Sequence, residues 1–94
     1  MYKLEIIKEG ELTRMLLNGE HKRFSLTVDW VAQHTVWLVN MNIEIDGQKW
    51  SSPEYMYNLH IDHKTLSLMC SDLENIINGY HRRQHRTAVV HHLS

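Results

Sequence analysis

Alternating hydrophobic and polar positions predict β-strands in the first half of the chain. Residues 2–8 place Tyr2, Leu4 and Ile6 on one face and Lys3 and Glu5 on the other, which is typical of a half-buried strand. A second strand is expected over residues 12–17. The dipeptide Asn18-Gly19 then marks a hairpin before a third strand at residues 24–28, with Phe24, Leu26 and Val28 on its core face.

The register of this hairpin depends on the length of its loop. A two-residue turn sets Met15 opposite Lys22, whereas a four-residue loop sets it opposite Phe24. Because Met15 and Phe24 are both apolar, burial favours the second pairing. We therefore expect the longer loop.

Residues 35–46 form the clearest strand pattern in the chain. One face carries the apolar residues Trp37, Val39, Met41, Ile43 and Ile45, and this face is predicted to be core. The opposite face is polar except at its start, where Val36 and Leu38 interrupt it. We expect Trp30 or a second subunit to cover these two side chains.

The pattern is ambiguous after the turn signal Asp46-Gly47. Ser51 and Glu54 have the spacing of a capping box, which would start a helix, whereas Tyr55, Tyr57, Leu59 and Ile61 alternate as in a strand. We favour a strand over residues 54–61.

A helical period replaces the alternation after residue 65. Apolar residues recur at helical spacing from Leu66 to Tyr80 and form one continuous stripe: Leu66, Met69, Cys70, Leu73, Ile76, Ile77 and Tyr80. Asp62 or Thr65 can cap the start, and Asn78-Gly79 offers a stop. An alternative start at Ser71, with Glu74 in capping-box position, would leave residues 65–70 as a short strand.

Together these elements predict a single α+β domain over residues 1–94. Its fold class is an antiparallel β-sheet of about four or five strands, packed on one face by a single C-terminal amphipathic helix. A chain of 94 residues buries a modest share of its surface, so small domains often gain stability by association. We expect a homo-oligomer, with a dimer as the default.

Charge is distributed unevenly along the chain. Residues 1–80 carry seven Lys or Arg against eleven Asp or Glu, whereas residues 81–94 hold Arg82, Arg83 and Arg86, four histidines and no acid. The last fourteen residues are therefore a basic His/Arg-rich extension of an acidic body. A nucleic-acid-binding regulator acting through these arginines is one hypothesis, although the acidic body opposes long-range attraction to a polyanion.

The single cysteine and the polar character of residues 1–5 bear on the compartment. Cys70 has no partner for an internal disulfide, and no apolar leader is recognisable. No apolar run approaches the roughly 20 residues that a spanning helix needs. We expect a cytoplasmic protein without membrane association.

Few residues are candidates for catalysis or for binding a metal. Cys70 lies on the apolar helical stripe, where its thiol would be buried and inert. His81 and His85 have two-ligand spacing, but no further ligand accompanies them and Arg82 and Arg86 would repel a cation. The cluster at residues 60–63 is better explained as a corner between elements. We therefore predict no enzyme activity, no cofactor and no metal.

Aromatic residues suggest a contact surface instead. Trp30, Trp37 and Trp50 fall within 21 residues, and tryptophan and tyrosine dominate binding hot spots. Trp50 stands beside turn residues that hinder full burial. The predicted partner-binding residues are Trp50, Tyr55, Tyr57, Arg82, Arg83 and Arg86.

The lead functional hypothesis is a small protein that binds another protein as an inhibitor or regulator. Immunity proteins, antitoxins and phage anti-defence proteins share this size and general fold class, an association that does not identify the target. The nucleic-acid-binding regulator is the alternative.

Overall fold

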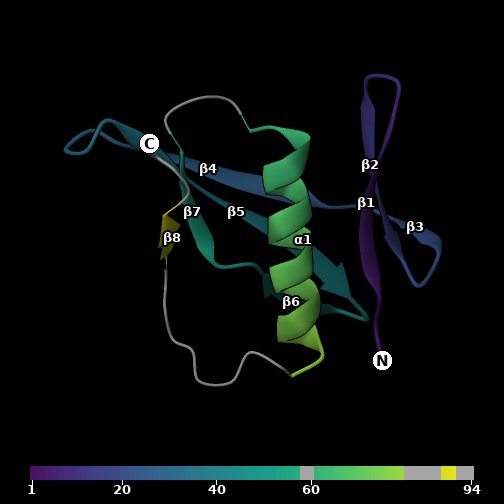
Figure 1. Cartoon of the computed structure of the whole chain (residues 1–94). Coiled ribbons are helices and arrows are strands. Elements are labelled where there is room, and N and C mark those ends of the chain that lie inside the picture. The colour runs from purple at the N-terminus through teal and green to yellow at the C-terminus, as the bar shows by residue number, and fades with distance from the viewer. Residues whose placement is uncertain (58–60, 80–87, 91–94) are drawn as a thin grey trace.

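A computed structural model describes residues 1–57, 61–79 and 88–90 of the chain. Eight strands and one helix follow one another in these residues (Figure 1). Their bounds are β1 Leu4–Glu9, β2 Leu12–Leu17, β3 Glu20–Lys22, β4 Ser25–Val31, β5 Val36–Ile45, β6 Gln48–Ser51, β7 Glu54–Tyr57, α1 His63–Ile77 and β8 Ala88–Val90.

The first three strands form a separate antiparallel sheet in the order β1-β2-β3. The turn between β2 and β3 is the two-residue one, with Met15 opposite Lys22, so the predicted pairing of Met15 with Phe24 is wrong. Asn18 and Gly19 have φ of 52° and 84°, the positive values that the tight hairpin turn requires at both central positions. Turn geometry therefore determines this register. Met15 is fully buried without Phe24 opposite it, and Phe24 packs against the core from the link to β4.

The second sheet is built around β5, its longest strand. β4 pairs with β5 along one side, while β6 and β7 pair with different parts of its other side. β7 also pairs in parallel with β8, a strand that the sequence pattern did not predict. Residues Glu54–Tyr57 are a strand, as favoured from the alternation, and Ile61 lies outside it.

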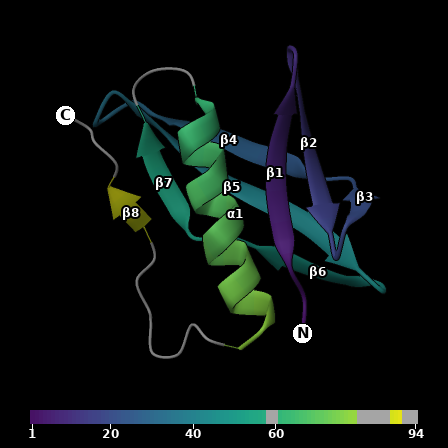
Figure 2. The same ribbon diagram turned by 45° about the vertical axis from the view of Figure 1, so that its right-hand side comes forward.

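The apolar face of β5 supplies much of the core. Val39, Met41, Ile43 and Ile45 are all buried, which confirms the predicted face for these positions. Leu4 and Met15 from the first sheet and Met69, Cys70 and Leu73 from the helix complete the cluster. The helix and the first sheet both lie over the same face of the second sheet (Figure 2). The core is therefore shared by the helix and both sheets.

The helix begins and ends at the residues whose chemistry favours a boundary. The Asp62 side chain accepts a hydrogen bond from the Thr65 N–H at 2.9 Å, so Asp62 is the N-cap. Asn78 is the C-cap, and Gly79 follows with a φ of 79°. Because the helix already begins at His63, the alternative of a strand over residues 65–70 is excluded. Three members of the predicted stripe are buried: Met69, Cys70 and Leu73.

Side chains from the end of the helix hold β1 and the residues before it in place. Asn78 accepts from the Tyr2 N–H at 2.9 Å and donates to the Tyr2 carbonyl at 2.8 Å. Glu74 accepts from the Leu4 N–H at 2.7 Å. Backbone groups that an edge strand would leave open are thus satisfied by the helix.

The predicted fold class, an antiparallel α+β domain with one C-terminal helix, is confirmed. The antiparallel strands divide into two sheets, because β3 ends at Lys22 and the chain then crosses over to begin β4 at Ser25. No helix among the described residues is long and apolar enough to cross a membrane.

Candidate interaction surface

The hairpin of β4 and β5 extends beyond α1 and β7, as Figure 1 shows at its left-hand side. A four-residue turn joins the two strands, with hydrogen bonds from His34 N–H to the Val31 carbonyl and from Thr35 N–H to the Ala32 carbonyl. The pairing register sets Trp30 opposite Trp37 on the face that also carries the core residues. This end of the hairpin carries the largest exposed side chains of the second sheet.

Three apolar side chains on this face are open to solvent. Val28 and Trp30 are each 48% exposed, and Trp37 is 38% exposed. The two indole rings lie 4.9 Å apart between centroids and are tilted by 54°, an arrangement that favourable aromatic pairs adopt. Contiguous exposed apolar groups of this kind often mark an interaction site.

Tyr57 extends this row onto a third strand. It is the direct partner of Trp37 across β5 and β7, and directly opposed residues of an antiparallel pair share one face. The Tyr57 hydroxyl lies 2.5 Å from the Thr65 hydroxyl in the first turn of the helix. We name Trp30, Trp37 and Tyr57, together with Val28, the aromatic row.

The structure corrects three expectations about these residues. Trp37 and Val28 lie on the predicted face but are not core, because the helix and the first sheet do not extend over this end of the hairpin. Trp30 does not cover Val36 and Leu38, since its pairing with Trp37 places it on the opposite face. Val36 and Leu38 are half-buried.

Trp50 lies at a different place, on β6 opposite Ile43. Its ring is half-buried and packs against the core, in agreement with the partial exposure expected beside a turn. It lines an open groove of about 770 Å³ whose other walls include Lys22, Arg23 and Lys49. The lining also includes a hydrogen-bonded series in which Ser51 donates to Asn42 and Asn42 donates to Thr27.

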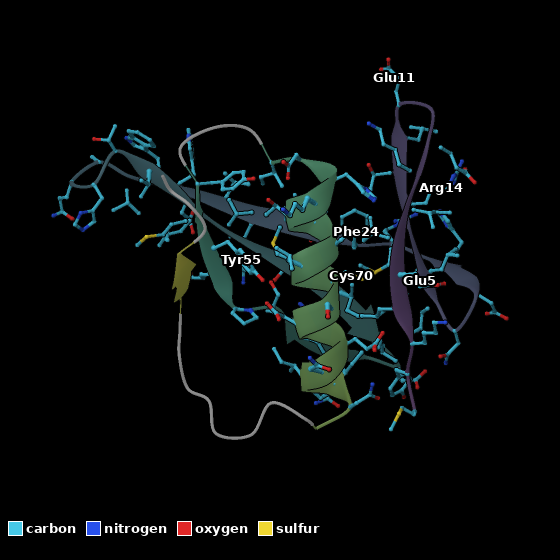
Figure 3. The ribbon with its side chains drawn as sticks, viewed as in Figure 1. Glu5, Glu11, Arg14, Phe24, Tyr55 and Cys70 are labelled. Atoms are coloured by element: carbon cyan, nitrogen blue, oxygen red, sulfur yellow. The ribbon has the colours of Figure 1, made fainter. Side chains whose placement is uncertain are left out.

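Tyr55 is only 3% exposed and belongs to the core. Figure 3 shows it between β7 and the helix, where its hydroxyl donates to Asp72. A buried ring with a bonded hydroxyl offers no surface to a partner in this structure. We therefore leave Tyr55 out of the candidate surface, although the sequence placed it there.

The remaining predicted contact residues, Arg82, Arg83 and Arg86, lie outside the described residues, as do His81 and His85.

Sequence reasoning grouped Trp50, Tyr55 and Tyr57 by their proximity along the chain. The structure instead brings Tyr57 together with Trp30 and Trp37. A usable signal was the unusual run Val36-Trp37-Leu38, which places apolar side chains on both faces of one strand end.

The titratable groups with altered pKa values have structural explanations. Burial raises the pKa of the Cys70 thiol to about 12, with smaller effects from Glu74 and Glu5. The hydrogen bond from the Thr65 backbone lowers the pKa of Asp62, the helix N-cap. Figure 3 shows Cys70 between the helix and β1. Across residues 1–57, 61–79 and 88–90, no three His, Cys, Asp or Glu side chains gather as metal ligands would.

Comparison with family models, curated proteins and solved structures found no match for this chain. The candidate surface is accordingly defined by the exposure, pairing and chemistry of the chain's own residues.

Proposed function

We propose that this protein binds another protein as a non-catalytic inhibitor or regulator, and that the aromatic row is its contact surface. The observation that carries the proposal is the exposure of Val28, Trp30 and Trp37 on the face that is buried elsewhere in the sheet. Leaving such side chains in water forgoes the burial energy that the rest of this face gains. A partner that covers them would recover it.

The geometry of the row suits a binding hot spot. Tryptophan and tyrosine desolvate a large area on binding and lose little rotamer entropy in doing so. Trp30 and Trp37 pack against one another with tilted rings, and the Tyr57 hydroxyl is hydrogen-bonded to Thr65. The surface is thus largely ordered before a partner arrives, which lowers the entropy lost on association.

Trp50 retains a secondary place in this proposal. The groove beside it combines its half-buried ring with Lys22, Arg23 and Lys49, but also with Glu44 and Asp46. Mixed charge of this kind resembles the polar rim of an interface more than its desolvated centre. We place the energetic centre at Trp37 and assign Trp50 to the periphery.

Two further parts of the proposal rest on the sequence. The protein is proposed to be cytoplasmic, since its single cysteine suits a reducing compartment. It is also proposed to self-associate, because the strand end with Val36 and Leu38 is apolar on both faces.

The test is affinity purification from the native host, with and without nuclease, using the wild-type chain and two variants. Trp37→Ala removes the centre of the row, whereas Leu12→Ala removes an apolar side chain that is 59% exposed on the other sheet. We expect a protein partner that resists nuclease and is captured equally by wild type and Leu12→Ala. Trp37→Ala should weaken binding by about 2 kcal/mol or more, roughly 30-fold, through faster dissociation. Circular dichroism checks that both variants fold.

The same experiment tests the alternative function, a nucleic-acid-binding regulator. Replacing Arg82, Arg83 and Arg86 by Ala should slow association modestly and flatten its salt response if the arginines only steer the partner. Loss of every partner on nuclease treatment, or loss of binding in the triple variant with Trp37→Ala unaffected, would overturn the proposal in favour of the basic extension.

A further inference from the structure

The outer edge of β4 has alternate backbone groups that point away from the sheet. Both the N–H and the carbonyl of Met41 bond to Ser52, on the side of β5 away from β4. Leu26, the partner of Met41 on β4, therefore occupies a non-hydrogen-bonded pair. By the alternation of an antiparallel ladder, Leu26, Val28 and Trp30 direct their N–H and carbonyl groups outward, and no described strand pairs with that edge.

Two of the other edge strands, β1 and β3, are protected by devices that β4 lacks. The backbone of β1 at Leu4 is satisfied by Glu74 of the helix. β3 has three residues, and two of them, Glu20 and Lys22, are charged. β4 has seven residues with one charge, Asp29, and neither proline nor lysine. Short length, charge and cover are the usual means of preventing edge pairing, and an edge without them is a template for another strand.

We propose that the partner on this edge is a second copy of the chain, paired antiparallel through β4 about a two-fold axis at Val28. This inference rests on the proposed function, because both place the contacts of the protein at the projecting β4–β5 hairpin. Val28 is the midpoint of the strand Ser25–Val31. Centring the axis there lets all seven residues of each copy pair.

This register is also the one that best matches side chains across the axis. It sets Leu26 opposite the partner's Trp30, and Thr27 opposite the partner's Asp29, where a hydroxyl can donate to a carboxylate. Val28 meets its own copy. Shifting the axis by one residue to Asp29 would oppose two like carboxylates, which is destabilising, and would leave fewer residues paired.

Pairing in this way would join the two second sheets into one continuous sheet. Val28 would then lie beside its own copy across the β4–β4 junction and Trp30 beside the partner's Leu26, with Trp37 one strand further from the junction in each subunit. The aromatic row would become a two-fold surface with twice the apolar area. Trp37, which lies on β5, would contact an external partner without taking part in the β4–β4 pairing.

Disulfide trapping tests the register directly. Val28→Cys would place two thiols on residues whose Cα atoms lie about 5.5 Å apart, within bonding range. Ser25→Cys is the matched control on the same strand, because its two copies would lie six residues out of register, roughly 20 Å apart. The native Cys70 is buried. We expect rapid covalent dimer formation for Val28→Cys and little for Ser25→Cys, and equal trapping of the two would overturn the register.

Sedimentation tests the association itself. Val28→Lys places like charges opposite one another at the axis, and should weaken the dimer by at least about tenfold. Leu12→Lys, the same change at an exposed strand position of the other sheet, should leave it unchanged. A wild-type chain that stays monomeric at high micromolar concentration, or a Val28→Lys dimer of full strength, would overturn the inference.

These experiments distinguish a failure of the proposed function from a failure of the β4 edge pairing. Loss of protein capture in Trp37→Ala alongside a monomeric wild type would retain the proposed function and reject the edge pairing. A β4-linked dimer whose Trp37→Ala variant captures partners normally would retain the edge pairing and reject the proposed function.

Discussion

Truncation of Leu73 to alanine measures how much of the stability depends on the buried face of the helix. Leu73 is fully buried at the centre of the core, between the helix and the two sheets. Leu→Ala changes at such sites cost about 2–5 kcal/mol from lost transfer energy and the cavity that remains. A domain of this size has about 5–15 kcal/mol of total stability. The single change should therefore remove a large fraction of it.

The assay is reversible denaturation by urea, with thermal melting as a second measurement. Each kcal/mol lowers the Tm of a domain of this size by about 4–8 °C, so Leu73→Ala should melt at least about 8 °C below wild type. Leu68→Ala is the matched control, since Leu68 lies on the same helix and is 39% exposed. A change below about 0.5 kcal/mol for Leu73→Ala, or an equal change for both variants, would contradict the assignment of the buried face.

Two predictions concern groups with altered pKa values. Burial raises the pKa of Cys70 to about 12, so iodoacetamide should alkylate native protein at pH 8 far more slowly than denatured protein; comparable rates would show an accessible thiolate. The pKa of Asp62 is lowered from 3.8, so its ionised form stabilises the fold above that pH, and this contribution is lost as pH falls through the lower, folded value. Urea denaturation of wild type and Asp62→Asn at pH 6 and in strong acid should give a stability difference that shrinks in acid, and a difference that grows would contradict the capping role.

Local chemistry was sufficient to predict the helix. The apolar stripe, the Asp62 cap and the Asn78-Gly79 stop all lie in the helix or next to its ends. A helical period cannot be satisfied by a strand, so the change of period after residue 65 specified both the element and its buried face. The same holds for Val39, Met41, Ile43 and Ile45 on β5.

The register of the first hairpin shows where local and burial arguments conflict. Pairing Met15 with Phe24 assumed that two apolar residues must meet across the strands. The positive φ values of Asn18 and Gly19 set the two-residue turn, and Met15 is buried among side chains from other elements. Turn chemistry was therefore the better predictor, because it acts within four residues and needs no tertiary contact.

The sequence by itself determined the helix, the longer strands and which face of each is apolar, since periodicity is a property of neighbouring residues. It did not predict the short strand β8. It did not determine which part of an apolar face is covered. Val39 and Trp37 share one face of β5, yet Val39 is 2% exposed and Trp37 is 38% exposed. Only the tertiary structure decided this, because burial depends on how far the helix and the first sheet extend along the hairpin, and those distances are set by contacts between residues far apart in the chain.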